Sequence, residues 1–288
     1  MRLMIVGADG QLGVDLVEQF QNKLDVIPLT YEDGDIADLD IVHSLFNKHE
    51  PDVVINTAAF HHVPKCEETP LRAFEVNALG ARNLAISARH IGAKLVHIST
   101  DYVFDGKKQS PYTEQDLPCP LNVYANTKLA GEYFVSAICD RYVIARVSGI
   151  YGKTRCIGKG SNFVNSMLRF YREGKPIQVV TDEILTPTST VEISRQLTVM
   201  LDHDCQGLFH VTCEGACSWH EFAQAIFDIL AYPVNVRPAK VADFPPAVKR
   251  PHYSVLENAR LKEAGINIIK DWKTALTHFL TTTEVDSL

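Results

Sequence analysis

The sequence has no long hydrophobic run and no surplus of basic residues. None of its 288 residues lies in an uninterrupted apolar stretch near the roughly 18 positions that a membrane-spanning helix needs. Its 28 basic side chains are outnumbered by 35 acidic ones, and a net charge of −7 disfavours binding to nucleic acid or to an anionic membrane. We therefore expect neither partner.

Signals of secretion and of a disulfide framework are also missing. The opening MRLMIVGADG lacks the successive basic, apolar and small-residue regions of a signal peptide. The seven cysteines are scattered and odd in number, which indicates free thiols in a reducing compartment. The expected location is the cytoplasm.

A metal site is the next class to consider. The segment HVTCEGACSWH places four potential zinc ligands close together, namely His210, Cys213, Cys217 and His220. Their spacing differs from the usual Cys-x2–4-Cys pairs of zinc sites. A strand, a glycine turn and a helix start explain the segment better, with Ser218 as N-cap and Glu221 completing a capping box. We predict no metal site.

Short apolar runs alternate with helical patterns through the first half of the chain. RLMIVGA, DVIPLT, DVVINTAA, AKLVHIST and RYVIARV are predicted to be buried strands, and the segments between them show helical spacing of apolar residues. This alternation predicts a Rossmann-type doubly wound α/β fold, with a parallel sheet covered on both faces. We expect residues 1–150 to form a dinucleotide-binding domain.

The pattern loosens after about residue 150. Amphipathic helices and short strands are mixed there, and no internal repeat is evident. We expect residues 151–288 to form mainly a smaller substrate-binding domain. The chain is predicted to return to the first domain around 176–205, with PIQVV as a strand that rejoins the sheet.

The first motif with chemical content is GADGQLG, which contains Gly7, Gly10 and Gly13. It follows the first strand directly and opens the first helix. Glycines in this context allow a tight turn and a close approach to a pyrophosphate, whose charge faces the helix N-terminus. The motif predicts dinucleotide binding, although G-x-x-G-x-x-G differs from the G-x-G-x-x-G of most dehydrogenases.

The second motif is the pair Tyr124 and Lys128 in VYANTKLAGE. Residues four apart lie on one face of a helix, where a surface pair is the alternative to a catalytic one. Together with the glycine motif, the pair resembles the short-chain dehydrogenase/reductase superfamily, in which a Tyr-x-x-x-Lys pair acts. That resemblance implies that Thr100, in VHISTDYVF, supplies the catalytic hydroxyl.

The chemistry of these three side chains follows from their acidities. A free phenol titrates near pH ~10, and we expect the nearby ammonium to lower the pKa of Tyr124. During reduction, Tyr124 would give its proton to a carbonyl oxygen and Thr100 would hydrogen-bond the same oxygen. Lys128 would also hold the nicotinamide ribose, while the cofactor supplies the hydride.

A longer series of blocks resembles one branch, the dTDP-4-dehydrorhamnose reductases. The blocks include PDVVINTAAF, VHISTDYVFDG, PYTEQDLPCPLNVYANTKLAGE and KRPHYSVLENARLKEAGI, and they extend from residue 1 to about 280. The resemblance implies reduction of the 4-keto group of a nucleotide-linked 6-deoxyhexulose. NADPH is the expected cofactor, and NADH stays open because LTYED at the end of the second strand decides for neither.

The resemblance also implies particular contacts. Besides the glycines and the catalytic residues, the cofactor contacts would be Gln11, Leu12, Asp35, Ile36, Ala58, Ala59, Asn77 and Ser99. The substrate contacts would be His61, His62, Val63, Lys65, Asp101, Tyr102, Gly149, Lys153, Arg155 and Arg250.

Three departures from the family pattern concern the sugar. The chain has AAFHHVPKCE where the family usually has a run like AAYTAVDKAE, and Gly149 where a tryptophan often packs beside the sugar. The loop KTRCIGKG carries Lys153, Arg155 and Lys159 with no acid among them. That loop is either a donor cluster for a diphosphate or a solvated basic loop. We expect an altered sugar specificity, with a gap at Gly149.

Two other functions remain open. The same fold occurs in the NADP-binding regulatory subunit of methionine adenosyltransferase, which is not a catalyst, and function lies in the site and not in the fold. A nucleotide-sugar epimerase or dehydratase is the second alternative. Dehydratases often have Asp-Glu after the threonine, whereas Asp101 and Tyr102 follow it here. The sequence excludes neither a monomer nor a homodimer.

Overall fold

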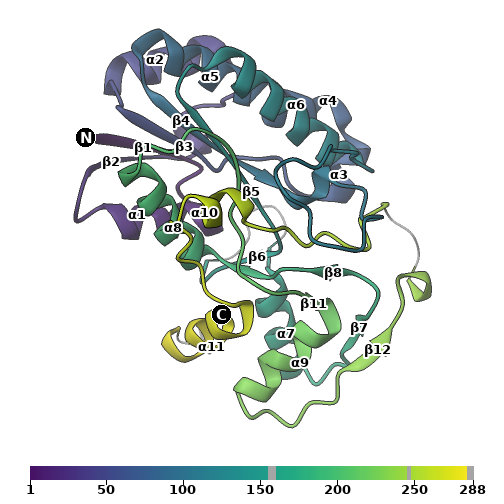
Figure 1. Cartoon of the computed structure of the whole chain (residues 1–288). Coiled ribbons are helices and arrows are strands. Elements are labelled where there is room, and N and C mark those ends of the chain that lie inside the picture. The colour runs from purple at the N-terminus through teal and green to yellow at the C-terminus, as the bar shows by residue number, and fades with distance from the viewer. Residues whose placement is uncertain (155–159, 245–247, 284–288) are drawn as a thin grey trace.

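The computed structural model describes residues 1–154, 160–244 and 248–283, and its centre is a six-stranded parallel sheet (Figure 1). The strand order is β10-β5-β4-β3-β1-β2. The strands are β1 (Arg2–Val6), β2 (Asp25–Leu29), β3 (Val53–Asn56), β4 (Lys94–Thr100), β5 (Tyr142–Val147) and β10 (Gly207–His210).

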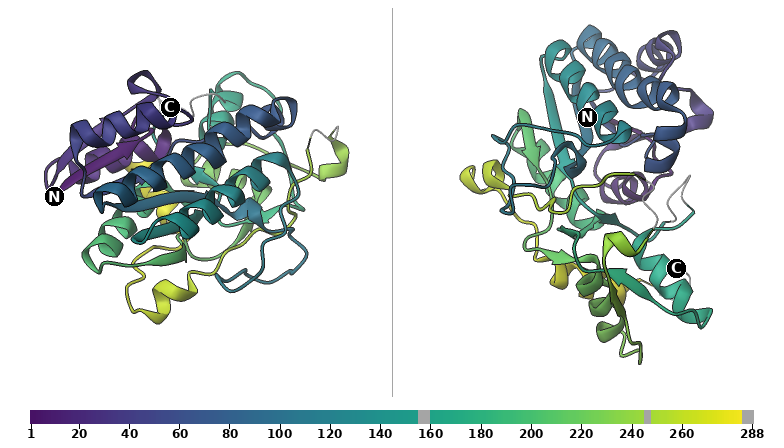
Figure 2. Two further views of the ribbon diagram at one scale, coloured as in Figure 1. Left: turned by 90° about the horizontal axis from the view of Figure 1, so that it is seen from above. Right: turned by 90° about the vertical axis from the view of Figure 1, so that its right-hand side faces the viewer.

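Helices cover both faces of this sheet, as Figures 1 and 2 show. Apolar residues of β1, β3 and β4 pack on one side against α2 (Leu39–His49), α5 (Gly80–Ile91) and α6 (Val123–Ile138). On the other side they pack against α1 (Gln11–Phe20) and α8 (Thr190–Asp202). Because both faces are buried, the strands are rich in apolar residues, as is typical of parallel sheets, although β4 also carries buried polar residues. The predicted doubly wound α/β fold is confirmed.

The strand order places a crevice beside β1. β1 pairs with β2 on one edge and with β3 on the other. The chain therefore leaves β1 in one direction and then crosses over it to continue in the other. Ligands of open α/β sheets bind at such a switch point, outside the carboxyl ends of the strands. The glycine turn after β1 lies at this edge.

A smaller body lies below the sheet in Figure 1. Its core packs aromatic and aliphatic side chains of α7 (Phe163–Arg172), α9 (Trp219–Ile229) and α11 (Trp272–Thr282). Ser218 and Glu221 form the expected capping box at the start of α9. Short paired strands complete it: β6 (Ile150–Tyr151) with β9 (Thr188–Ser189), β7 (Gln178–Val180) with β12 (Arg237–Ala239), and β8 (Ile184–Leu185) with β11 (Cys217–Ser218).

The chain returns to the main sheet differently from the prediction. The strand in PIQVV, β7, pairs with β12 and not with the central sheet, so that expectation is wrong. The return is made by α8, which packs on α1, and by β10, which pairs with β5. A short apolar run identifies a strand but not its partner, which here lies almost 60 residues away (178 to 237). The domain boundary near residue 150 stays a prediction.

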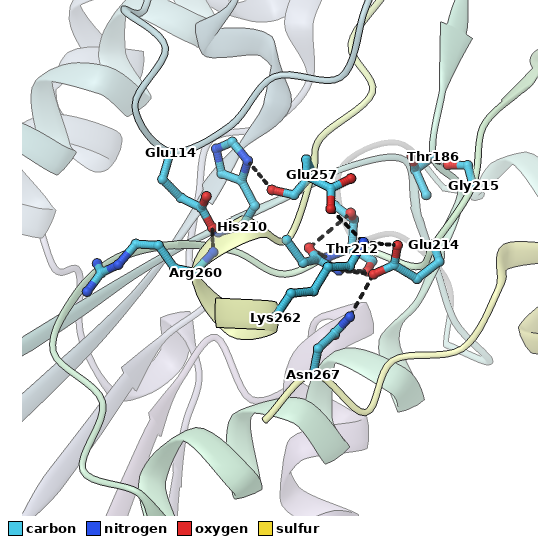
Figure 3. Close-up of polar contacts among 11 residues, drawn as sticks. Glu114, Thr186, His210, Thr212, Glu214, Gly215, Glu257, Arg260, Lys262 and Asn267 are labelled. Atoms are coloured by element: carbon cyan, nitrogen blue, oxygen red, sulfur yellow. Dashed lines mark hydrogen bonds and ion pairs between the residues drawn. The ribbon is translucent and has the colours of Figure 1, made fainter. Parts of the chain in front are cut away.

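Polar contacts anchor the C-terminal part of the chain beside β10 (Figure 3). A carboxylate oxygen of Glu114 accepts hydrogen bonds from the backbone N–H groups of His210 (2.9 Å) and Arg260 (3.4 Å). The Lys262 ammonium, from α10 (Ala259–Glu263), bridges Glu214 (2.7 Å) and Glu257 (2.6 Å). The chain that follows Arg250 is thus held beside β10 at Glu257, Arg260 and Lys262.

Several short helical turns lie near the carboxyl ends of the strands or in loops. They are η1 (Tyr31–Asp33), α3 (Val63–Glu68), α4 (Pro70–Phe74), the π-helical turn η2 (Glu75–Leu79), η3 (Asp101–Val103) and η4 (Val241–Asp243). Among the residues described, no helix is both long and apolar enough to cross a lipid bilayer.

A buried ion pair joins α6 to β5. Arg146 donates to Glu132 through Nε (2.9 Å) and Nη2 (2.6 Å), and the two side chains are only 3% and 5% exposed. The Ser99 hydroxyl also donates to Glu132, at 2.5 Å. Removing one partner of such a pair leaves an uncompensated buried charge. The pair therefore constrains how α6 sits on the sheet.

We expect Arg146→Met to lower the free energy of unfolding by about 3–5 kcal/mol, because the Glu132 carboxylate would stay buried without its partner. Urea unfolding followed by circular dichroism measures the change. Arg89→Met is the control, since its guanidinium is 60% exposed and lies 3.9 Å from Asp140 at the surface. The control should change stability by less than about 1 kcal/mol. Equal effects of the two substitutions would contradict the assigned role of the buried pair.

Candidate active site

The glycine turn after β1 leaves room only for backbone. Gly7 has a φ of +80°, and a Cβ there would lie 2.8 Å from Thr57 Oγ1 and 2.9 Å from the amide nitrogen of Ala58. A Cβ on Gly13 would overlap the carbonyl oxygen of Gly7. Strand, turn and helix therefore approach as closely as the sequence motif requires.

The N-terminus of α1 is open to an anion. Its N-cap is Gly10, whose lack of a side chain leaves the first amide groups uncapped. The side-chain oxygen of Gln11 accepts a hydrogen bond from Asn162 Nδ2 at 2.9 Å, which fixes that side chain, while its backbone N–H and side-chain NH2 are the donors of Gln11. Leu12 is buried in the core and supports the helix. This cradle fits the pyrophosphate of a dinucleotide.

A second set of residues lies at the carboxyl end of β2. Asp35 accepts from the backbone of Ala37 (3.0 Å) and pairs with the Arg72 guanidinium (2.5 Å). Ile36 beside it is buried. Asp33 accepts from the backbone and hydroxyl of Thr30, which turns its carboxylate back onto the chain and lowers its pKa. Arg72 could not be predicted as the partner of Asp35, because the two residues are 37 positions apart in the sequence.

Three side-chain contacts fix the start of α6, the helix that carries Tyr124 and Lys128. The side chain of Asn122 accepts from the Ala125 N–H (2.9 Å) and donates to the Lys249 carbonyl (2.9 Å). The Glu67 carboxylate accepts from the Val123 N–H at 2.8 Å. These contacts set the first turn, which carries Tyr124. Asparagine before a helix is a recognisable cap, whereas the Glu67 contact has no local signal.

Lys128 points into the sheet and not at the phenol. Its ammonium donates to the carbonyl of Ile98 at 2.6 Å and lies 3.4 Å from His97 Nε2. The side chain is 3% exposed. Burial lowers the pKa of Lys128 to about 8, and the nearby Glu132 carboxylate opposes this shift. Burial, with the charge of Lys128, also holds the pKa of His97 well below its ordinary value.

Tyr124 stands beside Thr100, as the motif requires. Burial raises the pKa of the Tyr124 phenol, while a hydrogen bond with Thr100 acts in the opposite direction. The ring of Tyr102 meets the ring of Tyr124 edge to face, with centroids 6.1 Å apart. The expectation that Lys128 lowers the pKa of Tyr124 is wrong for this structure, since the ammonium is engaged by Ile98 and burial dominates. The phenol is protonated and ready to donate.

The loop after β3 is held by Asn77, which lies in the π-helical turn η2. Asn77 is 1% exposed and bonds both the N–H (2.8 Å) and the carbonyl (2.9 Å) of Phe60. It also donates to the hydroxyl of Thr127 in α6, at 2.9 Å. Its side chain is thus committed to the protein. The predicted contact between Asn77 and the cofactor stays a prediction.

The same distinction applies to Ser99, Ala58 and Ala59. The Ser99 hydroxyl points into the buried Glu132 pair, away from the switch point. The Ala58 N–H donates to the side chain of Asn56 at 3.1 Å. The Ala59 carbonyl lies 3.2 Å from His61 Nδ1. The predicted contacts of these three residues with the cofactor stay predictions.

The two histidines of AAFHHVPKCE, the segment that departs from the family pattern, differ in role. His62 is the N-cap of α3, where its Nδ1 accepts from the backbone N–H of Lys65 at 3.2 Å. Val63 is buried behind it, and the side chain of Lys65 is exposed. His61 is half-buried at the mouth of the loop. The structural role of His62 was not expected, because histidine is an uncommon cap.

Two expectations about the substrate side of the site are corrected, namely the gap at Gly149 and the acid-free cluster at Lys153. Gly149 has a φ of +48°, and a Cβ there would lie 2.5 Å from Leu185 Cδ1. Glycine therefore serves a turn packed on Leu185, and the expected gap for a tryptophan does not exist. The ammonium of Lys153 pairs with Glu18 and lies 3.9 Å from Asp15, both on α1. It is not part of an acid-free cluster, while Arg155 and Lys159 lie outside the described residues.

The remaining substrate candidates gather around Tyr102. Arg250 is exposed, and its charge lowers the pKa of both Tyr102 and Glu183, although burial raises each of them overall. These groups come from three distant segments. Asp101, in contrast, is 3% exposed and lies behind Thr100. Its carboxylate accepts from the hydroxyls of Thr100 and Ser148, and its predicted contact with the substrate stays a prediction.

The two histidines of the segment HVTCEGACSWH have other partners, and its two cysteines are buried free thiols. His210 Nδ1 lies 3.1 Å from the Glu257 carbonyl, and His220 Nε2 lies 3.0 Å from the Val236 carbonyl. Within the described part of the chain, no three His, Cys, Asp or Glu side chains are placed to hold a metal ion.

Known proteins similar to this chain are found both by sequence and by structure. The family described as "RmlD substrate binding domain" matches residues 1–285. A dTDP-4-keto-6-deoxy-D-glucose reductase of Streptomyces niveus is 36% identical over 279 residues, which are 96% of this chain and 95% of that one. Two solved dTDP-4-dehydrorhamnose reductases superpose closely. That of Clostridium acetobutylicum ATCC 824 has a TM-score of 0.93 with 41% identity, and that of Bacillus anthracis str. Ames, in complex with NADP, 0.94 with 36%. Each covers 98% of this chain and 99% of the other.

We expect Gly10→Val to abolish dinucleotide binding while the protein stays folded. A Cβ at Gly10 would approach only the Gly7 carbonyl oxygen, at 3.2 Å, so the branched side chain fits the fold but fills the anion cradle. Calorimetry with NADPH and thermal unfolding measure the two effects. Gly13→Ala is the matched variant, which should unfold at lower temperature because its Cβ overlaps Gly7. NADPH binding to Gly10→Val at wild-type affinity would disprove the assignment.

Proposed function

The chain belongs to the dTDP-4-dehydrorhamnose reductase family of extended short-chain dehydrogenases/reductases, and we propose that it reduces the 4-keto group of a dTDP-linked 6-deoxyhexulose with NADPH. One observation carries the proposal. Thr100, Tyr124 and Lys128 meet at the carboxyl end of β4, two strands from the glycine cradle after β1. This is the edge of the sheet where a dinucleotide and a second substrate meet.

Tyr124, Thr100 and Lys128 each have a separate role in the reduction of the ketone. NADPH, when bound, supplies the hydride. Tyr124, protonated because burial raises its pKa, donates its proton to the carbonyl oxygen as that oxygen gains charge. Thr100 lies beside it and hydrogen-bonds the same oxygen. Lys128, held by the Ile98 carbonyl, presents its remaining donors to the nicotinamide ribose.

The sugar itself is proposed at the level of a class. Two arguments for an altered sugar specificity no longer hold. Gly149 leaves no gap, and the Lys153 ammonium is paired with Glu18 of α1. His61 and the exposed Arg250 remain as donors at the mouth of the site. A panel of dTDP-4-keto-6-deoxyhexoses, offered with NADPH and with NADH, tests the proposal through loss of nicotinamide absorbance. NADP binding without oxidation of NADPH by any ketone would support the non-catalytic regulatory subunit instead.

Cytoplasmic location and assembly are proposals of the same kind. The cysteines among the described residues are free thiols, as expected in a reducing compartment. A homodimer stays a prediction, which size-exclusion chromatography with light scattering tests.

We expect Tyr124→Phe to lower kcat by roughly 10²–10⁴ while the Kd for NADPH changes little, because the hydroxyl acts only as a general acid. Steady-state kinetics and calorimetry measure the two quantities. Tyr133→Phe is the matched control, since this phenol lies on the same helix and is 61% exposed. A Tyr124→Phe enzyme within tenfold of wild type would exclude the mechanism.

We expect Lys128→Met to impair both kcat and NADPH binding, because Lys128 both neighbours the reacting site and holds the ribose. The same two measurements apply. An unchanged Kd for NADPH would show that Lys128 does not contact the cofactor.

A further inference from the structure

Asp101 is a buried carboxylate for which the mechanism above has no use. It follows the catalytic threonine directly and opens the turn η3. Its Oδ1 accepts from the Thr100 hydroxyl at 3.1 Å, and its Oδ2 accepts from the Ser148 hydroxyl at 2.9 Å. The Ser254 hydroxyl also hydrogen-bonds the carboxyl. Three hydroxyls, two of them from distant points of the sequence, therefore converge on one acid that is 3% exposed.

The single proton of Thr100 limits what this residue can do. A threonine hydroxyl donates one hydrogen bond and accepts two. Thr100 already accepts from the backbone N–H of Tyr102 at 3.2 Å. When Asp101 is ionised it can only accept, so it takes the Thr100 proton. Thr100 then has no proton left to offer a substrate oxygen.

We propose that Asp101 is a positioning residue that sets the direction of the Thr100 hydroxyl, so that Thr100 donates to the substrate carbonyl only when Asp101 is neutral. In the neutral state Asp101 donates its own proton to Thr100 Oγ1. Thr100 then accepts from Asp101 and from the Tyr102 N–H. Its proton points to the side of Tyr124, with which Thr100 is hydrogen-bonded, and there it can reach the substrate oxygen. No covalent bond changes in this step. The inference rests on the proposed ketone reduction.

The environment of Asp101 allows both states near neutral pH. Burial raises the pKa of Asp101 to about 6, against hydrogen bonds from Ser254, Ser148 and Thr100 that lower it. Raising the pH through this value ionises Asp101 and withdraws the Thr100 proton from the substrate. The expected result is a kcat that falls as the pH rises through about 6.

Other titratable groups face this acid and need separate controls. The phenols of Tyr102 and Tyr124 have raised pKa values and stay neutral in this range. Arg250 stays charged beside Tyr102. Burial raises the pKa of Glu183, opposed by Arg250 and by a nearby histidine, so Glu183 is the neighbour that must be distinguished. The buried thiol of Cys66 also lies near Tyr124.

The kinetic experiment is the pH profile of kcat with saturating NADPH and ketone, from roughly pH 5 to pH 8. Wild-type enzyme should show the falling limb. Asp101→Asn and Thr100→Val should lose the limb, whatever their absolute rates, and Thr100→Ser should keep it. Glu183→Gln should keep it too. A limb that survives in Thr100→Val or Asp101→Asn, or that vanishes in Glu183→Gln, would overturn the proposal.

A second readout does not depend on turnover. The infrared band of protonated Asp101, obtained as the difference between wild type and Asp101→Asn during a pH titration, reports the ionisation directly. Ser148→Ala should move its midpoint to higher pH, because one hydrogen bond that favours the carboxylate is removed. A midpoint near the ordinary value of about 4, or one that Ser148→Ala leaves in place, would refute the role of Asp101. A wild-type protein that reduces no ketone but shows these shifts would instead refute only the proposed function.

Discussion

The position of the catalytic residues depends on two charges buried under one helix. Lys128 and Glu132 lie one turn apart on α6, and both point into the sheet, where the first binds the Ile98 carbonyl and the second binds Arg146. A buried charge must keep its partner, since losing it costs several kcal/mol. Any slip of α6 along the sheet would break both contacts together. Tyr124, one turn before Lys128 on the same face, is therefore placed by its neighbours. The Tyr-x-x-x-Lys motif is part of a longer stripe whose remaining members hold it in register.

The active site is closed from the other side by chain that comes much later. The Lys249 carbonyl binds Asn122 at the start of α6, and Ser254 reaches the acid behind Thr100. The segment that brings these groups is anchored beside β10 by Glu114 and Lys262. The cap of α6 at Asn122, the Thr100 hydroxyl and the exposed Arg250 are thus all positioned by this one segment. Binding of a sugar at this segment can act on the catalytic residues through backbone contacts as well as through direct ones.

Much of this could be predicted because it is local. The strand–helix alternation, the glycine turn and the Tyr–Lys spacing are properties of neighbouring residues, and the fold and family they indicated are confirmed. The errors concern partners that lie far away in sequence. Nothing near Gly149 reveals that Leu185 fills the space beside it, and nothing near Lys153 reveals Glu18. Likewise, the spacing of Tyr124 and Lys128 predicts that the two side chains interact, whereas in the structure the Lys128 ammonium donates to the Ile98 carbonyl on β4. Burial, the dominant influence on Tyr124, is a property of the whole fold.

The π-helical turn around Asn77 bears on how this chain tolerates insertions and deletions. Its closing hydrogen bond runs from the Gly80 N–H to the Glu75 carbonyl, one residue further than in an α-helix. The turn thus accommodates one extra residue between α4 and α5, each of which keeps its own packing. Because a residue advances an α-helix by about 100°, deleting one residue here would rotate Asn77 away from Phe60 or α5 away from the sheet. Length variation among relatives should therefore be rare in this turn, although it is exposed at Leu79.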